Sequence, residues 1–251
     1  FKCSQRLHIK KTNEAAVFAR IAAVADQHVR ATGDQIIVPD MNNIIAGFAA
    51  VGALGDEVRV ISPRLRRVNP LYITPVSLAL FGGSPPAMMF HGDSPIPLDK
   101  SEAIEVESNA VPGANEVHSV GLWLADGKQS KIDGEIHTIN ATINLAQVLS
   151  SWEMSEITLP DALPVGQYTV VGARAEIAGG VLFRLVPVGG INRPGGICAQ
   201  TAGGVDPFMQ RFGRLGQWLT FDTITPPAVE VLGSAAAGAV TYDVFLDVIK
   251  M

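Results

Sequence analysis

The chain has little charge and no long apolar run. Of its 251 residues, 17% are charged and 47% are hydrophobic, and the mean hydropathy is +0.26. About a quarter of an ordinary soluble domain is charged. The longest apolar candidate, residues 44–54, is far shorter than the roughly 18 residues that would cross a bilayer. An apolar chain without a membrane span has to bury its surface, and large subunit interfaces are one place to do so.

The motifs of common enzyme and cofactor sites are also missing. Neither glycine-rich phosphate-binding signature occurs, which leaves nucleotide binding without support. The two cysteines, Cys3 and Cys198, are too few for a metal cluster and either pair or stay free. The block Gly92-Asp93-Ser94 resembles the nucleophile block of GDSL-type esterases. That family needs a late histidine, and none follows His137, so a turn is the better interpretation.

Histidines do not form a metal-binding pattern either. The five histidines include no His-x-His or His-x-x-x-His pair. His118 and His137 fall on neighbouring predicted strands, but a metal site would need a third ligand, such as Glu116 or Glu135. We therefore expect no enzyme, no cofactor and no metal site.

The sequence changes character near residue 75. Before it, apolar residues recur with helical spacing from about residue 13 to Arg30, and residues 41–54 form a second helix candidate. Residues 1–70 carry ten Lys/Arg and six Asp/Glu, a net of +4, against −9 for the rest. We predict an N-terminal helical, basic segment over residues 1–75. This segment either touches an acidic partner such as nucleic acid or is a solvated terminal region.

Strands dominate the remainder, residues 76–251. The clearest is 135–145, where Ile139, Ala141 and Ile143 face one way and polar residues face the other. Gly179-Gly180 predicts a hairpin between two further strands. Including one strand before residue 75, the predicted strands are 57–62, 87–90, 103–107, 116–124, 135–145, 168–177, 181–188, 217–223, 228–232 and 239–249. This pattern predicts a mainly β chain, an antiparallel β-sandwich or jelly roll with an N-terminal helical segment.

Charged residues on these strands have no pattern that demands chemistry. Glu102, Glu105 and Glu107 form one acidic stretch, and Asp243 and Asp247 share one side of the last strand. Nothing sets a catalytic or calcium-binding separation between them, so we expect solvated strand faces.

The densest group of positive charges is made of four arginines. We call it the basic cluster: Arg59, Arg64, Arg66 and Arg67. Such a cluster can contact phosphates or the interior of an assembly. Pairing with acidic residues of a neighbouring subunit explains it equally well.

One connection, residues 189–216, is unusually long and contains eight glycines. Loops of this length in compact domains are usually functional or lie at contacts. The predicted subunit-contact residues are Gly195, Gly196, Phe208, Arg211 and Phe212.

Residues 103–251, with many short strands and one long glycine-rich loop, resemble jelly-roll viral coat proteins in architecture. The resemblance implies a self-assembling structural subunit located in the virion. Its partners would be copies of itself, other virion proteins and nucleic acid contacted without sequence specificity. The alternative is a carbohydrate-binding or adhesive β-sandwich module of a virion or cell surface. Its stacking residues would be Trp123, Trp152 and Trp218, of which Trp123 and Trp218 fall in predicted strands and suit a core.

Overall fold

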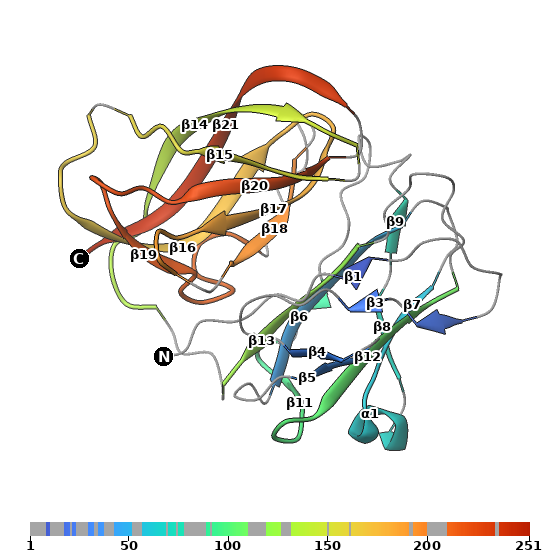
Figure 1. Cartoon of the computed structure of the whole chain (residues 1–251). Helices are drawn as coiled ribbons and strands as arrows, with labels where there is room; N and C mark the ends of the chain where they lie inside the picture. The colour runs from blue at the N-terminus through green and yellow to red at the C-terminus, as the bar shows by residue number, and fades with distance from the viewer. Residues whose placement is uncertain are drawn as a thin grey trace. The chain divides into compact units, whose positions relative to one another are not determined.

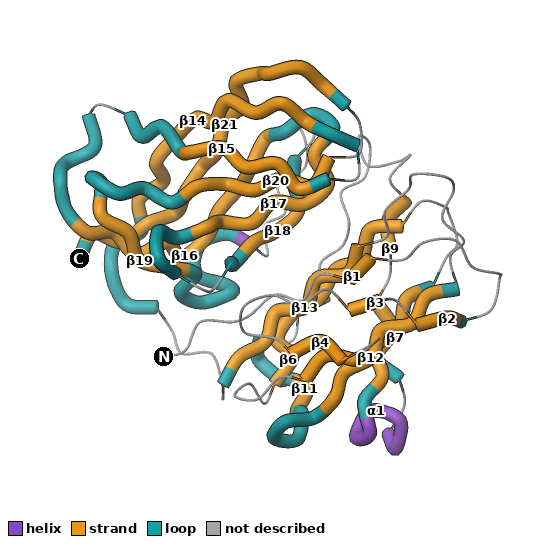
Figure 2. The backbone as a smooth tube through the Cα atoms, viewed as in Figure 1, coloured by secondary structure: helices purple, strands orange, loops and turns teal. Residues whose placement is uncertain are grey.

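A computed structural model shows a mainly β chain with antiparallel sheets (Figure 2). The structure describes these residues: 9–10, 18–20, 22–23, 30–32, 35–37, 43–51, 57–68, 70–73, 75–77, 89–90, 92–109, 119–126, 132–149, 151–160, 162–190, 193–199, 210–233 and 236–251. Within them, no helix is long and apolar enough to cross a membrane.

The chain divides into two compact units, Phe1–Lys128 and Gln129–Met251, here called unit 1 and unit 2. The change of sequence period had instead placed a boundary after residue 75.

Unit 2 contains two four-stranded antiparallel sheets. One has the order β14-β21-β16-β19 and the other β15-β20-β17-β18 (Figure 1). The strands are β14 (His137–Gln147), β15 (Trp152–Glu156), β16 (Gln167–Glu176), β17 (Gly180–Val186), β18 (Gly195–Ile197), β19 (Leu219–Asp222), β20 (Ala228–Gly233) and β21 (Ala237–Lys250).

The strand pairs of unit 2 are nested. The first strand pairs with the eighth, the second with the seventh, the third with the sixth and the fourth with the fifth, each antiparallel. Two further pairings, β16 with β21 and β17 with β20, join these four pairs into the two sheets.

Alternation along the strands places the core of unit 2 as predicted. Ala141, Ile143 and Leu145 of β14 are buried, whereas Asn140 and Asn144 are exposed. Buried apolar residues come from both sheets, and the ring of Phe183 on β17 stacks on that of Trp218 just before β19, with centroids 6.3 Å apart.

One local prediction in unit 2 was wrong. Gly179-Gly180 does not close a hairpin, because β16 and β17 belong to different sheets. Two strands, β15 and β18, were not predicted; β18 begins with Gly195-Gly196, which looks like a turn in sequence.

Unit 1 holds the remaining strands. One sheet has β6 paired with β9, β10, β11 and β13; the next has the order β4-β5-β12-β7-β8 with β2 beside β12; β1 pairs β3. The elements are β1 (Ile9–Lys10), β2 (Ala19–Arg20), β3 (Ala22–Ala23), β4 (Arg30–Thr32), β5 (Gln35–Ile37), β6 (Asn43–Val51), β7 (Val58–Ile61), α1 (Pro63–Val68), β8 (Leu71–Ile73), β9 (Pro75–Ser77), β10 (Met89–Phe90), β11 (Ile96–Pro97), β12 (Ala103–Ser108) and β13 (Ser119–Ala125).

The predicted N-terminal helices were wrong. Residues 43–51 form strand β6, and the described parts of residues 13–30 are short strands. On β6, Ile44 and Ala49 belong to the core cluster of unit 1, while Ile45 and Phe48 are also buried. A strand buried on both faces has a continuous apolar run, which periodicity cannot distinguish from a buried helix.

The sequence did not predict α1, the α-helix found among the described residues. Ser62 caps it, since the Ser62 Oγ accepts a hydrogen bond from the Leu65 amide at 3.0 Å. Pro63 occupies the first helical position, where a missing N–H costs nothing.

Candidate functional site: contact surfaces

Three consecutive residues at the end of the glycine-rich connection, Gln210 to Phe212, are bound tightly to the body of unit 2. Arg211 reaches Asp247 of β21 with two hydrogen bonds, Nε to Oδ2 at 2.6 Å and a terminal nitrogen to Oδ1 at 2.8 Å. Asp247 also accepts from the Thr138 hydroxyl at 2.8 Å and the Phe212 amide at 3.0 Å. Four donors thus surround a fully buried carboxylate, which was expected to be solvated.

Gln210 is buried and links strands of both sheets. Its amide nitrogen donates to the carbonyls of Ala173 on β16 at 3.1 Å and Ile197 on β18 at 3.0 Å, and its oxygen accepts from the Ile197 amide at 3.0 Å. A Cβ at Gly196 would overlap with this oxygen, so the second glycine of β18 makes room for Gln210.

Phe212 is the predicted contact residue of this connection that the structure leaves exposed. Gly195, Gly196 and Arg211 are buried within the chain, and Phe208 lies outside the described residues. The Phe212 side chain is 47% exposed, its φ is 54°, and the Arg211 guanidinium lies 4.7 Å from its ring centroid. Phe212 therefore places an exposed aromatic ring on a backbone that hydrogen bonds from Arg211 and from its own amide to Asp247 hold in place, which we call a rigid base.

A second exposed apolar surface is the far end of the β14–β21 pair. We call residues 144–149 and 236–242 the ribbon. β21 runs alongside β14 in Figure 1, and β16 pairs only with its later part, from Asp243 on. Residues 236–241 are exposed, and the exposed large side chains of the ribbon are Val148, Leu149 and Val240.

The ribbon lacks the usual protection of an edge strand. No charged residue or proline occurs between residues 231 and 242. Within the described part of the chain, no strand pairs with the other edge of residues 237–242. Open edges without charge or proline are templates for pairing with another chain. Gln147, opposite Ala237 in the ribbon, is buried, and its amide donates to the Tyr242 hydroxyl at 2.8 Å and the Ala178 carbonyl at 2.7 Å.

The first arginine of the basic cluster is paired within the chain. Arg59 on β7 contacts Glu107 on β12 at 2.6 Å, and its guanidinium lies 3.9 Å from the ring centroid of Phe18. Burial works against the charged form, but hydrogen bonds and charge from Glu107 and Tyr72 outweigh it and raise the pKa of Arg59. The acidic stretch of the same unit thus neutralises Arg59.

The rest of the basic cluster lies on α1. Arg64 pairs with Asp99 at 3.1 Å and stays partly exposed. The side chains of Arg66 and Arg67 lie outside the described residues. The nucleic-acid or interior contact of the basic cluster stays a prediction.

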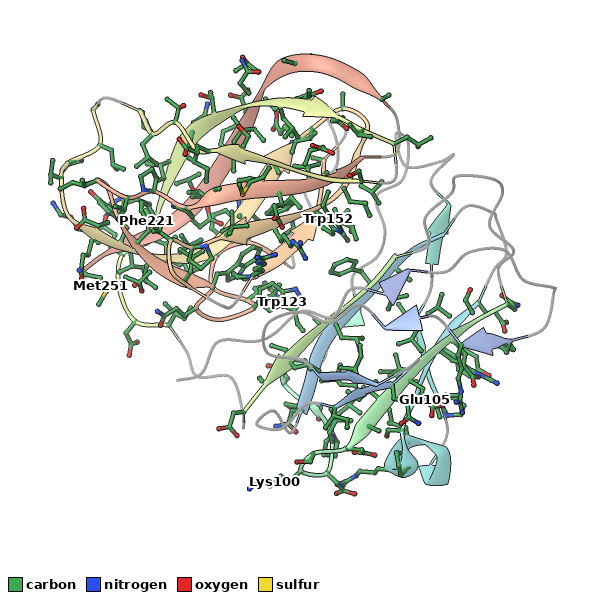
Figure 3. All side chains as sticks on the ribbon, viewed as in Figure 1. Lys100, Glu105, Trp123, Trp152, Phe221 and Met251 are labelled. Atoms are coloured by element: carbon green, nitrogen blue, oxygen red, sulfur yellow. The ribbon has the colours of Figure 1, made fainter. Side chains whose placement is uncertain are left out.

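The acidic stretch itself was expected to be solvated, and this expectation was wrong. Glu102, Glu105 and Glu107 are all buried. Glu105, labelled on β12 in Figure 3, pairs with Arg20 at 3.1 Å and accepts from Gln35 at 2.6 Å. Glu102 accepts from the backbone amides of Arg64 and Asp99 at 2.7 and 2.6 Å, which ties α1 to the turn before β12.

Among the described residues, no group of three His, Cys, Asp or Glu could hold a metal ion. His137 lies 3.9 Å from Glu135, both exposed, whereas His118 and Glu116 lie outside the described residues. Cys198 is buried, and Cys3 also lies outside them.

Comparison with known protein families, with curated proteins and with solved structures finds no match for the chain.

Proposed function

We propose that the chain is a structural subunit of a self-assembling shell, a viral capsid protein built on a jelly roll. The observation that carries the proposal is the nested strand pairing of unit 2. A jelly roll is a long antiparallel hairpin of four strand pairs, first with last, wrapped so that alternate pairs fall into two sheets. The sheet orders β14-β21-β16-β19 and β15-β20-β17-β18 are those expected of such a hairpin and support the proposal.

The exposed surfaces support assembly over catalysis. The ribbon offers an unprotected apolar edge, and Phe212 offers an aromatic ring on a rigid base. Interfaces are enriched in such aromatic residues and depleted in charge at their centres. The partners of these surfaces are copies of the chain and other proteins of the virion.

The alternative of a carbohydrate-binding module is less well supported, although jelly rolls also occur in lectins. Sugar binding needs exposed aromatic faces, and Trp123 and Trp218 are completely buried. Trp152 is partly exposed, but the Arg184 guanidinium lies 4.4 Å from its ring centroid and covers one face. A glycan array without hits would remove this alternative.

Light scattering and negative-stain imaging of the purified chain test the proposal. Closed particles or tubes at micromolar concentration are the expected result. A clean monomer at that concentration would refute the shell.

The ribbon can be tested in the same assay with Val240→Lys. A lysine at the contact must lose its hydration, which costs several kcal/mol, so the concentration needed for assembly should rise about tenfold or more. Val165→Lys is the matched control, because Val165 is an exposed valine in the turn before β16. Assembly of Val240→Lys at the wild-type concentration would show that the ribbon is not a contact.

A further inference from the structure

Unit 1 repeats the strand arrangement of unit 2. We infer that the chain contains the same roll twice, in tandem, so that one chain supplies two like building blocks. The inference about the fold stands on strand order, spacing and register. Its consequence for assembly rests on the proposed function.

The order of neighbouring strands is the first support. In unit 2, β16 lies between β21 and β19, and in unit 1, β6 lies between β13 and the short strands β9, β10 and β11. β17 lies between β20 and β18 as β7 lies between β12 and β8. β15 pairs with β20 as β5 pairs with β12. The equivalent strands follow one another in the same sequence order in both units.

Spacing along the chain is the second support. β6 starts at 43 and β16 at 167, which is 124 residues later. β7 starts at 58 and β17 at 180, 122 residues later, and β11 at 96 and β19 at 219, 123 residues later. β12 starts at 103 and β20 at 228, 125 residues later. Unrelated connections would not hold the interval this constant over four strands.

Register is the third and most detailed support. Val60 pairs with Leu71, and 124 residues later Arg184 pairs with Gly195. In the same pair of strands, Val58 pairs with Ile73, and Leu182 pairs with Ile197, again 124 residues later. A one-residue slip would turn every side chain to the other face, so a repeated register is a strong constraint.

The two longest equivalent pairings also share an irregularity. The β6–β13 ladder passes from Ala46 to Ile44 and leaves Ile45 without a partner residue in β13. The β16–β21 ladder passes from Gly172 to Val170 and likewise leaves Val171 without a partner residue in β21. Bulges persist within families as features of the fold. Here one recurs 126 residues along the same chain.

The first strand of the roll has a shorter counterpart. In unit 2, β14 flanks β21; in unit 1, β1 precedes β5 in the chain and lies against β13. Among the described strands, β2, β3, β4, β9 and β10 have no equivalents in unit 2, and β9 runs parallel to β6. These additions sit around a shared arrangement and do not interrupt its order.

Two like units in one chain change the number of roll-shaped units in a shell relative to its number of chains. A ring or closed contact built from such chains contains twice as many roll-shaped units as chains. Contacts that two separate subunits would make elsewhere can therefore form between unit 1 of one copy and unit 2 of the next. Imaging of wild-type assemblies should resolve two lobes for each chain counted by native mass spectrometry. One lobe per chain would overturn the tandem arrangement.

Engineered disulfides test the repeat without assembly, in a Cys3→Ser and Cys198→Ala background. Ile37 pairs with Ala103 in unit 1, and Glu156 with Ala228 in unit 2, and none of these four side chains is fully buried. We expect Ile37→Cys/Ala103→Cys and Glu156→Cys/Ala228→Cys to crosslink on mild oxidation, read as linked peptides in the folded fraction. Crosslinking in unit 2 without crosslinking in unit 1 would overturn the inference.

The control is Gln35→Cys/Ala103→Cys, which is two residues out of register. Its Cα atoms should lie about 7–8 Å apart, beyond the usual disulfide range. If it crosslinks as readily as the in-register pair, the pairing of β5 with β12 is wrong.

A second pair in unit 1, Asn43→Cys/Ala125→Cys, uses half-exposed sites on β6 and β13 should the first variant fail to fold. Failure of both unit 1 pairs in folded protein would likewise overturn the inference. A monomeric wild type whose in-register pairs all crosslink would refute the shell and leave the repeat standing.

Discussion

Replacing Arg211 by methionine should cost unit 2 a large part of its stability. Asp247 is completely buried, and two of the four hydrogen bonds it accepts come from the Arg211 guanidinium. Arg211→Met fills similar volume but leaves a carboxylate in the interior without its counter-charge. Breaking a buried pair in this way costs about 3–5 kcal/mol, and a whole domain has about 5–15 kcal/mol to lose.

Urea unfolding followed by circular dichroism measures this loss. Arg214→Met is the matched control: Arg214 is an exposed arginine of the same connection, and its replacement should change the free energy of unfolding by less than about 0.5 kcal/mol. The double variant Arg211→Met/Asp247→Leu removes both charges. We expect it to be more stable than Arg211→Met alone, because no unpaired charge remains buried.

A free energy of unfolding for Arg211→Met within about 1 kcal/mol of the wild type would contradict this expectation, since a buried unpaired charge costs more than that. A double variant less stable than Arg211→Met would contradict it as well. In that case the pair would act through packing and not through charge.

Four further substitutions test close packing and buried hydrogen bonds. Gly172→Ala places a Cβ 2.6 Å from Asp247 Oδ2 and should cost about 1–3 kcal/mol, whereas Gly238→Ala meets nothing within 4 Å and should leave the melting temperature unchanged. Gln210→Leu removes three buried hydrogen bonds and should lower the free energy of unfolding in urea by about 2–4 kcal/mol. An unchanged free energy of unfolding would contradict this expectation. Glu102→Gln leaves one of two amides without an acceptor and should cost about 1–2 kcal/mol, seen as faster hydrogen exchange in α1.

Strands with one buried face could be predicted from the sequence, and strands buried on both faces could not. β14 alternates because one side meets the core and the other meets water, and its faces were predicted. The apolar face of β21 was predicted at Val244, Leu246 and Val248, but Asp247 on its other face is buried. β6 carries apolar residues on both faces, so its pattern has neither period and favoured a helix. β18 is short and starts with two glycines. A larger residue does not fit at Gly196, because Gln210 lies against it.

Local sequence patterns could not predict which charged residues pair with each other. Glu107 and Arg59 are 48 residues apart, and Asp247 and Arg211 are 36 residues apart. A sequence pattern shows an acidic strand and a basic cluster, but only the strand pairing shows that they neutralise each other. The contact role of the glycine-rich connection stays a prediction. Of its predicted contact residues, Phe212 is exposed, whereas Gly196 and Arg211 are used inside the unit.

Equivalent positions of the two rolls can carry different side chains, and there is a physical reason. Sheet order and register are held by backbone hydrogen bonds, which every residue except proline can make. Equivalent positions therefore need only suit their local surroundings: Val60 is a core residue of unit 1, whereas Arg184, 124 residues later, pairs with Glu230. Where both positions are buried, as at Ile73 and Ile197, the side chain is simply apolar. Two halves can thus diverge in every charge and turn while the ladder between their strands keeps its register and its bulge.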